Sequence, residues 1–201
     1  MPYFDSERGR LHCRRWALDD PAARIALLPG TGQHSGHYHR FAAALRSAGI
    51  ELWALDTAGQ GLSEGDPAAP GGLAELTADA QQFLALVRTD HSAAPVLMGH
   101  SLGAATAVHL ATENPADLAG LVLCGTPRRA AAVVPDPALP VLAVHGVDDR
   151  RAPVDVIRLW TARHRSVDLR EYADAGHDLL HEPVRDRVAA DIARWVLTVV
   201  R

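Results

Sequence analysis

Short, continuously apolar runs alternate with longer segments of helical periodicity along most of this chain. The runs "IALL", "VLM", "LVLC" and "VLAV" contain no polar residue, which is typical of strands buried on both faces of a parallel sheet. Such strands alternating with helices predict an α/β fold, a mostly parallel twisted sheet with helices on both faces. Right-handed crossovers then place the loops that follow the strands along one edge of the sheet, where ligands bind.

The same patterns give the expected elements. Strands are expected at residues 11–18, 24–28, 51–56, 95–99, 120–124, 140–145 and 167–172. Helices are expected at about residues 38–47, 73–88, 102–114, 154–163 and 184–200. A chain of 201 residues organised in this way is expected to form one domain over residues 1–201.

The composition is that of an ordinary globular protein, with 48% hydrophobic and 22% charged residues. Its net charge of −4 gives no reason to expect a nucleic-acid partner. No apolar run reaches the length of a membrane span, and the polar start "MPYFDSERGR" does not resemble a signal peptide. Cys13 and Cys124 lie in strand-like runs and are expected to be buried and reduced, so we expect a cytoplasmic protein.

The stretch "LMGHSLGAA" places Ser101 between two glycines, at the junction of an expected strand and an expected helix. Gly99 and Gly103 remove side chains that would collide with the neighbouring strand and helix, which is the mechanical basis of the G-x-S-x-G nucleophile elbow. The turn aims the serine oxygen outwards and places it at a helix N-terminus, where negative charge is favoured. We therefore expect Ser101 to be a nucleophile, with an N-capping serine as the alternative.

A serine nucleophile needs a base, and a histidine held by a carboxylate is the usual solution. Asp148 and Asp149 lie in the loop "VDDRRAPV" after a core strand, and His177 lies in a loop after the last strand. The resulting chain order of serine, aspartate and histidine is that of an α/β-hydrolase. All of these loops are expected at the carboxyl edge of the sheet, so the side chains are able to converge.

An ester hydrolase also needs two backbone donors for the oxyanion. One expected donor is the N–H of Leu102, the residue after the nucleophile. The other is expected from Thr31 in the loop "PGTGQHSGHY", where Gly30 and Gly32 let backbone N–H groups face a ligand. A glycine turn without a ligand is the alternative.

The same loop contains His34 and His37, and His39 follows it directly; a metal site is conceivable from such a cluster. No cysteine or carboxylate accompanies these histidines, and His37 and His39 would point apart on a helix, so we expect neither a metal nor a cofactor. A pocket lining or a helix start is the expected role of the cluster. We expect His34, Gly30 and His100, the variable position of the elbow, to border the substrate.

Together these stretches resemble the α/β-hydrolase superfamily, and more narrowly its monoacylglycerol lipase, lysophospholipase and serine-aminopeptidase-like branch. The matching segments are "LPGTGQHSGHYHRFAAAL", "LDTAGQGLSEG", "LMGHSLGA", "PVLAVHGVDD" and "YADAGHDLLHEP". The resemblance implies a nucleophile, an acid, a base and two oxyanion donors, which are Ser101, Asp149, His177, Leu102 and Thr31. The family spacing after "HG" selects the second of the two aspartates.

The chain departs from that branch in two ways. Pro29 stands where a histidine is usual, Ala58 and Gln60 stand where arginine and histidine are usual, and His37 replaces a common arginine. In the branch, a helical cap follows the strand after the nucleophile's helix, whereas only "RRAAAVVPDPAL" links "GLVLCGTP" to "PVLAVHG" here. We therefore expect a minimal core without a cap domain or lid. A homodimer in which a second copy covers the groove through residues 128–135 is the alternative.

These features predict a serine hydrolase that cleaves a small or short-acyl carboxylic ester or thioester through an acyl-enzyme. Acyl transfer or amide cleavage at the same site, and a ligand-binding protein with little turnover, are the alternatives. A haloalkane dehalogenase or an epoxide hydrolase would need an aspartate at position 101. A Rossmann nucleotide site is only weakly matched by "PGTGQHSG".

Overall fold

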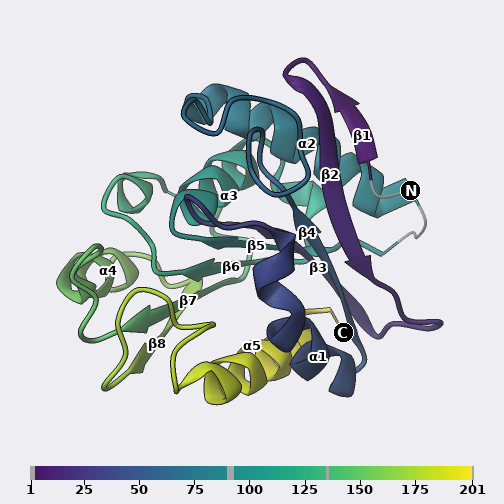
Figure 1. Cartoon of the computed structure of the whole chain (residues 1–201). Helices are drawn as coiled ribbons and strands as arrows, with labels where there is room; N and C mark the ends of the chain where they lie inside the picture. Colours follow the sequence, from purple (N-terminus) through teal and green to yellow (C-terminus); the bar gives the residue numbers. More distant parts are fainter. Residues whose placement is uncertain (1–2, 90–92, 135, 201) are drawn as a thin grey trace.

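The computed structural model describes residues 3–89, 93–134 and 136–200. These residues form an eight-stranded sheet in the order β1-β2-β4-β3-β5-β6-β7-β8 (Figure 1). The strands are β1 (Tyr3–Ser6), β2 (Gly9–Trp16), β3 (Ala23–Leu28), β4 (Ile50–Leu55), β5 (Val96–His100), β6 (Gly120–Cys124), β7 (Val141–Gly146) and β8 (Val167–Tyr172). β2 pairs antiparallel with β1 and β4, and the other pairs are parallel, so the predicted mostly parallel sheet is confirmed.

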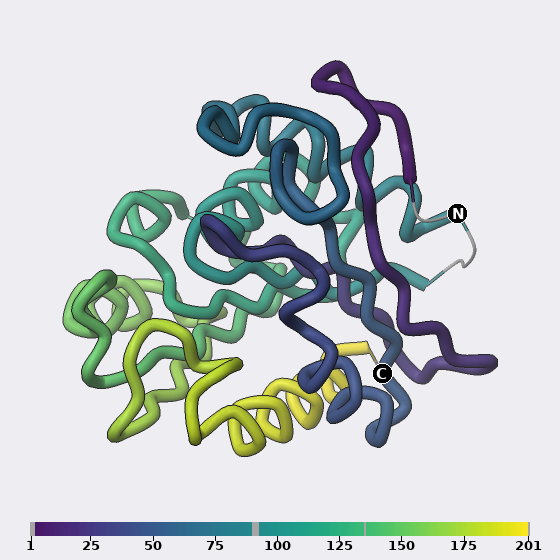
Figure 2. The backbone as a smooth tube through the Cα atoms, in the orientation of Figure 1, coloured from purple at the N-terminus to yellow at the C-terminus, as the bar shows by residue number. Residues whose placement is uncertain are grey.

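Helices cover both faces of the sheet. They are α1 (His39–Ser47), α2 (Leu73–Thr89), α3 (Leu102–Glu113), α4 (Val154–Thr161) and α5 (Arg185–Val199), with 3₁₀ helices η1 (Ser35–Tyr38), η2 (Pro115–Asp117) and η3 (Ala130–Ala132). One core cluster contains side chains of α2, α3 and α4, and the other contains those of α1 and α5. α1 and α5 come from opposite ends of the chain and pack side by side (Figure 2). None of the helices formed by the described residues is long and apolar enough to cross a membrane.

The central strands are buried on both faces, as their apolar sequences predict. All residues of β3 are buried. Ile25 and Leu27 belong to the core beneath α1 and α5, whereas Ala26 and Leu28 belong to the core beneath α2, α3 and α4. Successive side chains of a strand point to opposite faces, so one apolar run supplies both cores. Each fully buried aliphatic side chain stabilises the fold by about 1.5–3 kcal/mol.

β1 is not among the strands expected from the sequence. Its residues alternate between exposed and half-buried, and it lies at the edge of the sheet, so it lacks the apolar run that marks the central strands. Ser6 Oγ donates a hydrogen bond to Asp79 Oδ1 at 2.5 Å, and the Arg8 guanidinium pairs with the other oxygen of Asp79. Asp79 is a buried residue of α2, so these polar contacts attach the β1–β2 hairpin to the helical layer.

The link between β6 and β7 is the segment where a cap was expected to be missing. Position 135 lies outside the described residues, and among the remaining residues of this link the only helix is η3. Ala130 is buried in the core shared with α3 and α4, and the Trp160 indole donates to the Val133 carbonyl at 3.0 Å. The link is therefore packed beside α4. Val134, within the surface expected to meet a second copy, is 65% exposed.

The two cysteines are free and buried, as expected. Cys13 lies on β2 and Cys124 ends β6. Burial raises the pKa of the Cys13 thiol to about 11, so this group stays protonated at neutral pH. Both thiols therefore act as small apolar side chains in the core.

Candidate active site

Ser101 occupies a tight turn between the end of β5 and the start of α3. Its backbone has φ 53° and ψ −111°, a conformation that residues other than glycine rarely adopt. The turn is held because Ser101 N–H donates to the Cys124 carbonyl of β6 at 2.9 Å. A Cβ on Gly99 would collide with the Gly103 carbonyl, and a Cβ on Gly103 would collide with the Leu28 carbonyl. The two glycines therefore permit the close contact of strand and helix, as the sequence predicts.

Ser101, His177 and Asp149 form a continuous hydrogen-bonded chain. His177 Nε2 lies 2.8 Å from Ser101 Oγ, and His177 Nδ1 lies 2.7 Å from Asp149 Oδ2. Asp149 Oδ1 accepts from the backbone N–H groups of Arg151 and Ala152, both at 2.8 Å. The Asp149 carboxylate is buried, so these partners supply the donors that water would otherwise provide. The loops after β5, β7 and β8 thus bring the three predicted residues together.

His145, near the end of β7, contacts the loop that carries Asp149. It is fully buried, and its Nε2 lies 2.6 Å from the Ala152 carbonyl and 3.5 Å from Asp149 Oδ2. Burial lowers the pKa of His145, which favours the neutral ring. A neutral ring with its proton on Nε2 donates to the carbonyl and fixes the turn that orients Asp149.

The predicted oxyanion donors lie on the loop after β3 and at the start of α3. The N–H of Gly30 donates to Gln33 Oε1 at 3.2 Å. By contrast, the N–H groups of Thr31 and Leu102 have no hydrogen-bond acceptor among the described residues. Thr31 also borders the cleft beside Ser101.

Gln33 and His100 connect the three loops of the site behind the reacting atoms. Gln33 Oε1 accepts from the hydroxyl of Tyr38 at 2.6 Å and lies 2.9 Å from His100 Nδ1. His100 Nε2 lies 3.0 Å from the His177 carbonyl, to which it donates. Burial lowers the pKa of His100 and favours a neutral ring, whose single N–H on Nε2 donates to the His177 carbonyl and leaves Nδ1 without a proton for Gln33. The side chain of His100, the last residue of β5, therefore holds the backbone that carries His177.

A second charged group, on the loop after β8, lies beside His177. Asp178 Oδ1 accepts from Gln33 Nε2 at 3.1 Å and lies 2.8 Å from His181 Nδ1. Burial opposes the charge of Asp178, but the hydrogen bond and charge of His181 lower the pKa of the carboxyl below its ordinary value. The hydrogen bond to Asp178 raises the pKa of His181 in return. Glu182 accepts from the N–H groups of Gly176 and Asp178, at 2.6 and 2.9 Å.

A cleft of about 330 Å³ opens over Ser101. It is lined by Gly30, Thr31, Gln33, His100, Ser101, Arg151, His177, Asp178 and Glu182. Gly30 and His100, which were predicted to border the substrate, are thus among its lining residues. His34 is not among its lining residues; it caps η1, where its Nδ1 accepts from the Gly36 N–H at 3.2 Å.

Four lining residues were not expected from the sequence: Gln33, Arg151, Asp178 and Glu182. The sequence could have pointed to Asp178 and Arg151, because they lie one and two residues from members of the predicted triad. Gln33 follows Gly30 and Gly32, and only the fold shows that its side chain reaches His100.

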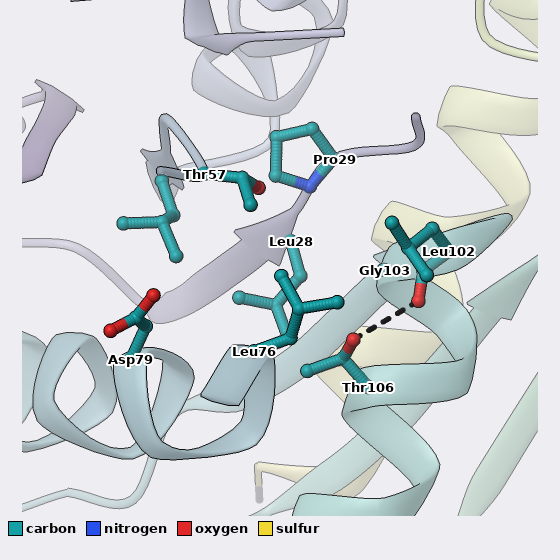
Figure 3. Close-up of a pocket in the computed structure, with 9 residues that line it drawn as sticks. Leu28, Pro29, Thr57, Leu76, Asp79, Leu102, Gly103 and Thr106 are labelled. Carbon is teal, nitrogen blue, oxygen red and sulfur yellow. Dashed lines mark hydrogen bonds between the residues drawn. The ribbon is translucent and has the colours of Figure 1, made fainter. Parts of the chain in front are cut away.

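A smaller, apolar hollow lies beside the first turn of α3, between α2 and the end of β3 (Figure 3). Leu28 and Pro29 form one wall, Leu76 of α2 forms another, and Leu102 and the following turn of α3 close it. Thr106 donates its hydroxyl to the Leu102 carbonyl at 3.1 Å, which satisfies its polar group at this apolar wall. The hollow holds only about 10 Å³, the space of one water molecule, and has no room for an acyl chain.

The three histidines that follow β3, which are His34, His37 and His39, do not converge on one point. The rings of His34 and His37 lie 4.1 Å apart. The indole N–H of Trp16 instead donates to His39 Nδ1 at 3.2 Å. Among the described residues, no set of three histidines, cysteines or carboxylates is suited to hold a metal ion.

Comparisons with known proteins agree with this architecture. A family model described as Serine aminopeptidase, S33 (Hydrolase_4) matches residues 19–137, more than half of the chain. A human protein named monoglyceride lipase is 34% identical over 126 residues, which cover 61% of this chain but 42% of the relative. The chain therefore matches less than half the length of that relative. A monoacylglycerol lipase of Mycolicibacterium smegmatis is 24% identical, with 91% of each chain covered.

Solved structures show the same fold. Est1E from Butyrivibrio proteoclasticus, with ferulic acid bound, has a TM-score of 0.87 at 15% identity, and 98% of each chain is covered. The monoacylglycerol lipase of Paleococcus ferrophilus has a TM-score of 0.79 at 18% identity, with 94% of this chain and 99% of that chain covered. At these identities the likeness shows the fold alone, and it confirms the predicted α/β-hydrolase core.

Proposed function

The chain belongs to the serine aminopeptidase S33 family, and from this premise we propose that it is a carboxylic ester hydrolase that acts through Ser101, His177 and Asp149. The observation that carries the proposal is the unbroken hydrogen-bonded chain from Ser101 Oγ through both ring nitrogens of His177 to Asp149. The names of the relatives, which are monoglyceride and monoacylglycerol lipases, support the choice of an ester as substrate.

Acylation begins when His177 Nε2 takes the proton of Ser101 Oγ while that oxygen attacks the ester carbonyl carbon. The N–H groups of Thr31 and Leu102 donate to the oxyanion that develops on the carbonyl oxygen. Asp149 holds the ring of His177 in place and stabilises its positive charge. The tetrahedral intermediate collapses, the proton on Nε2 passes to the departing alcohol, and Ser101 keeps the acyl group.

Deacylation repeats these steps with water. His177 Nε2 takes a proton from a water molecule, whose oxygen attacks the acyl carbon. The bond to Ser101 Oγ then breaks, Oγ recovers the proton from His177, and the carboxylic acid leaves. Another acceptor in place of water would give acyl transfer, and an amide in place of the ester would give amide cleavage. A ligand-binding protein with little turnover is the third reading.

We further propose a single-domain core without a lid that acts on short acyl groups. Two observations support this reading: the described part of the β6–β7 link contains only η3 as a helix, and the apolar hollow beside the elbow is too small for an acyl chain. The alignment with the M. smegmatis relative spans 255 positions, more than the 201 residues of this chain, so that relative contains segments without a counterpart here. A cytoplasmic location stays a prediction from the sequence.

The test is covalent labelling combined with turnover. A fluorophosphonate should label the wild-type protein at Ser101, located by peptide mass spectrometry, and p-nitrophenyl esters should be hydrolysed. Ser101→Ala should abolish the label and lower turnover by several orders of magnitude, because the members of a triad act as a unit. Labelling without turnover would favour the ligand-binding reading. Turnover that survives in Ser101→Ala at a tenth of the wild-type rate would refute the assignment of the nucleophile.

A further inference from the structure

Arg151 is the arginine that lines the catalytic cleft, two residues after Asp149 in the loop that follows β7. The same carboxylate that faces His177 also accepts the backbone N–H of Arg151 at 2.8 Å. The turn that orients the acid of the triad therefore also fixes the Cα of Arg151. Arg151 is an exposed residue, and Ser101 and His177 line the same cleft.

The carboxylates of the cleft are already engaged by donors of the protein. Both oxygens of Glu182 accept backbone N–H groups, from Gly176 and Asp178. Asp178 is bound by Gln33 and by His181, whose raised pKa favours the charged ring that offsets the carboxylate. No carboxylate lies within ion-pair distance of Arg151 in the part of the chain that the structure describes. Among the described residues, the guanidinium of Arg151 therefore has no protein acceptor for its donors, and Arg151 borders the cleft.

We propose that Arg151 is a specificity-determining residue that binds an anionic group of the substrate, so that the preferred ester carries a carboxylate. The inference rests on the ester hydrolase activity proposed above and names its substrate class. A guanidinium presents donors in a fixed fork that matches a carboxylate, and such charge-assisted pairs are stronger than neutral hydrogen bonds. A neutral short-chain ester would leave this group without a partner.

Two pairs of substrates test the proposal. In the first pair the charge is on the acyl group, with p-nitrophenyl hydrogen adipate compared with p-nitrophenyl hexanoate, which has the same number of acyl carbons. Adipate is chosen because its carboxylate is too far from the ester to form a small cyclic anhydride readily. In the second pair the charge is on the alcohol, with 4-carboxyphenyl butyrate compared with 4-carbamoylphenyl butyrate.

The wild-type protein should favour the charged member of at least one pair by about tenfold or more in kcat/KM, the size expected for one charged hydrogen bond. Arg151→Gln should remove most of that ratio through KM, and Arg151→Lys should retain part of it. Arg150→Gln is the matched control, because Arg150 is the exposed neighbour that does not line the cleft, and it should keep the wild-type ratio. Raising the salt from about 0.02 to 0.5 M should reduce the ratio in the wild type, since an exposed charge pair is screened.

The substrate pair that shows the preference indicates whether the acyl group or the alcohol of the ester faces Arg151. Hydrolysis of hexanoate or carbamoylphenyl butyrate with no preference for either charged partner would overturn this inference and leave the ester hydrolase proposal intact. Equal ratios in the wild type and in Arg151→Gln would overturn it as well. A protein that hydrolyses none of the four esters contradicts the proposed function itself.

Discussion

Ser101 Oγ and His177 Nε2 lie 2.8 Å apart although 76 positions of the chain separate them. The parallel sheet makes this possible, because the carboxyl ends of β5 and β8 meet at one edge. His177 is held there by its own carbonyl, which accepts from His100, and by Asp149.

Asp149→Asn should cost on the order of 10⁴ in kcat, whereas Asp148→Asn should cost far less. Asp149 Oδ2 lies 2.7 Å from His177 Nδ1, and an amide there removes the charge and favours the wrong tautomer of the ring. Asp148 is exposed, so it is a matched control of the same chemistry. Steady-state kinetics on one activated ester measures both. Similar losses in the two variants would mean that the acid is wrongly assigned.

Thr31→Pro should lower kcat by about 10²–10³, because proline removes the backbone N–H proposed as an oxyanion donor. Thr31→Ala keeps that N–H and should have a mild effect. Circular dichroism and thermal unfolding of both variants show whether the loop after β3 remains folded. A large loss in a folded Thr31→Ala variant would instead point to the threonine hydroxyl as the donor.

Among neutral esters, C2 and C4 acyl groups should be hydrolysed best, with rates falling towards C16. Each buried methylene contributes about 0.8 kcal/mol, and the small hollow beside the elbow offers no wall on which a long chain gains this energy. We also expect no increase in rate where the substrate forms micelles. Light scattering should accompany the rates: a monomer that prefers C12 or longer contradicts the open groove, whereas a dimer with that preference supports a pocket built by a second copy.

Ser101→Gly should unfold at a higher temperature than Ser101→Ala, although we expect both variants to be inactive. The backbone at φ 53° and ψ −111° disfavours any residue with a Cβ, and such conformations cost of the order of 1–3 kcal/mol. Glycine relieves this cost but loses about 0.5–1 kcal/mol through the entropy of its unfolded chain. We expect a net difference of about 1 kcal/mol in the free energy of unfolding. An equal or lower stability of the glycine variant means that the elbow is not strained at this residue.

His181→Gln should lower stability at pH 5.5 more than at pH 9. The pKa of His181 is raised in the folded state, so its contribution is full below its ordinary value of 6.5 and is lost as the pH rises through the folded value. The pKa of Asp178 is lowered, so its contribution is full above its ordinary value of 3.8 and is lost as the pH falls through the folded value. The Asp178–His181 pair therefore stabilises the folded state most between pH 3.8 and pH 6.5, the ordinary pKa values of the two groups. Because it is partly exposed, we expect less than about 1 kcal/mol.

Urea unfolding at the two pH values measures this difference. His109→Gln is the control, because His109 is also partly exposed and lies 3.7 Å from Glu113 without a hydrogen bond to it. Its effect should not change between the two pH values by as much as that of His181→Gln. A pH-independent loss in His181→Gln would assign the residue a packing role beside Tyr38 instead.

Much of the fold can be predicted from the sequence because the central strands are buried on both faces. β6 and β8 have the expected bounds, and the other predicted strands differ from theirs by one or two residues at either end. β1 escapes prediction since a half-buried edge strand such as "YFDS" carries no periodic apolar signal. Its place is decided by pairing with β2 and by the contacts of Ser6 and Arg8 with Asp79, which are distant in the chain.

The residues of the candidate site also differ in whether the local sequence predicts them. Ser101 can be predicted because the glycines on either side of it are a local requirement of the turn. Gln33 and Arg151 could not be assigned a place, because nothing in their immediate sequence shows which side chains the other loops bring to them. Local sequence thus indicates the residues whose backbone is constrained, whereas the rest of the cleft is defined only by the meeting of several loops.

The crowding behind Ser101 determines where this protein can change in evolution or in the laboratory. No side chain larger than hydrogen fits at Gly99 or Gly103 without displacing the backbone of β3 or α3, so neither position tolerates substitution. Arg151, in contrast, reaches the cleft from an exposed position whose backbone is anchored independently by Asp149. A library that randomises position 151 should therefore yield folded proteins with altered substrate preference, whereas one that randomises positions 99 and 103 should return glycine.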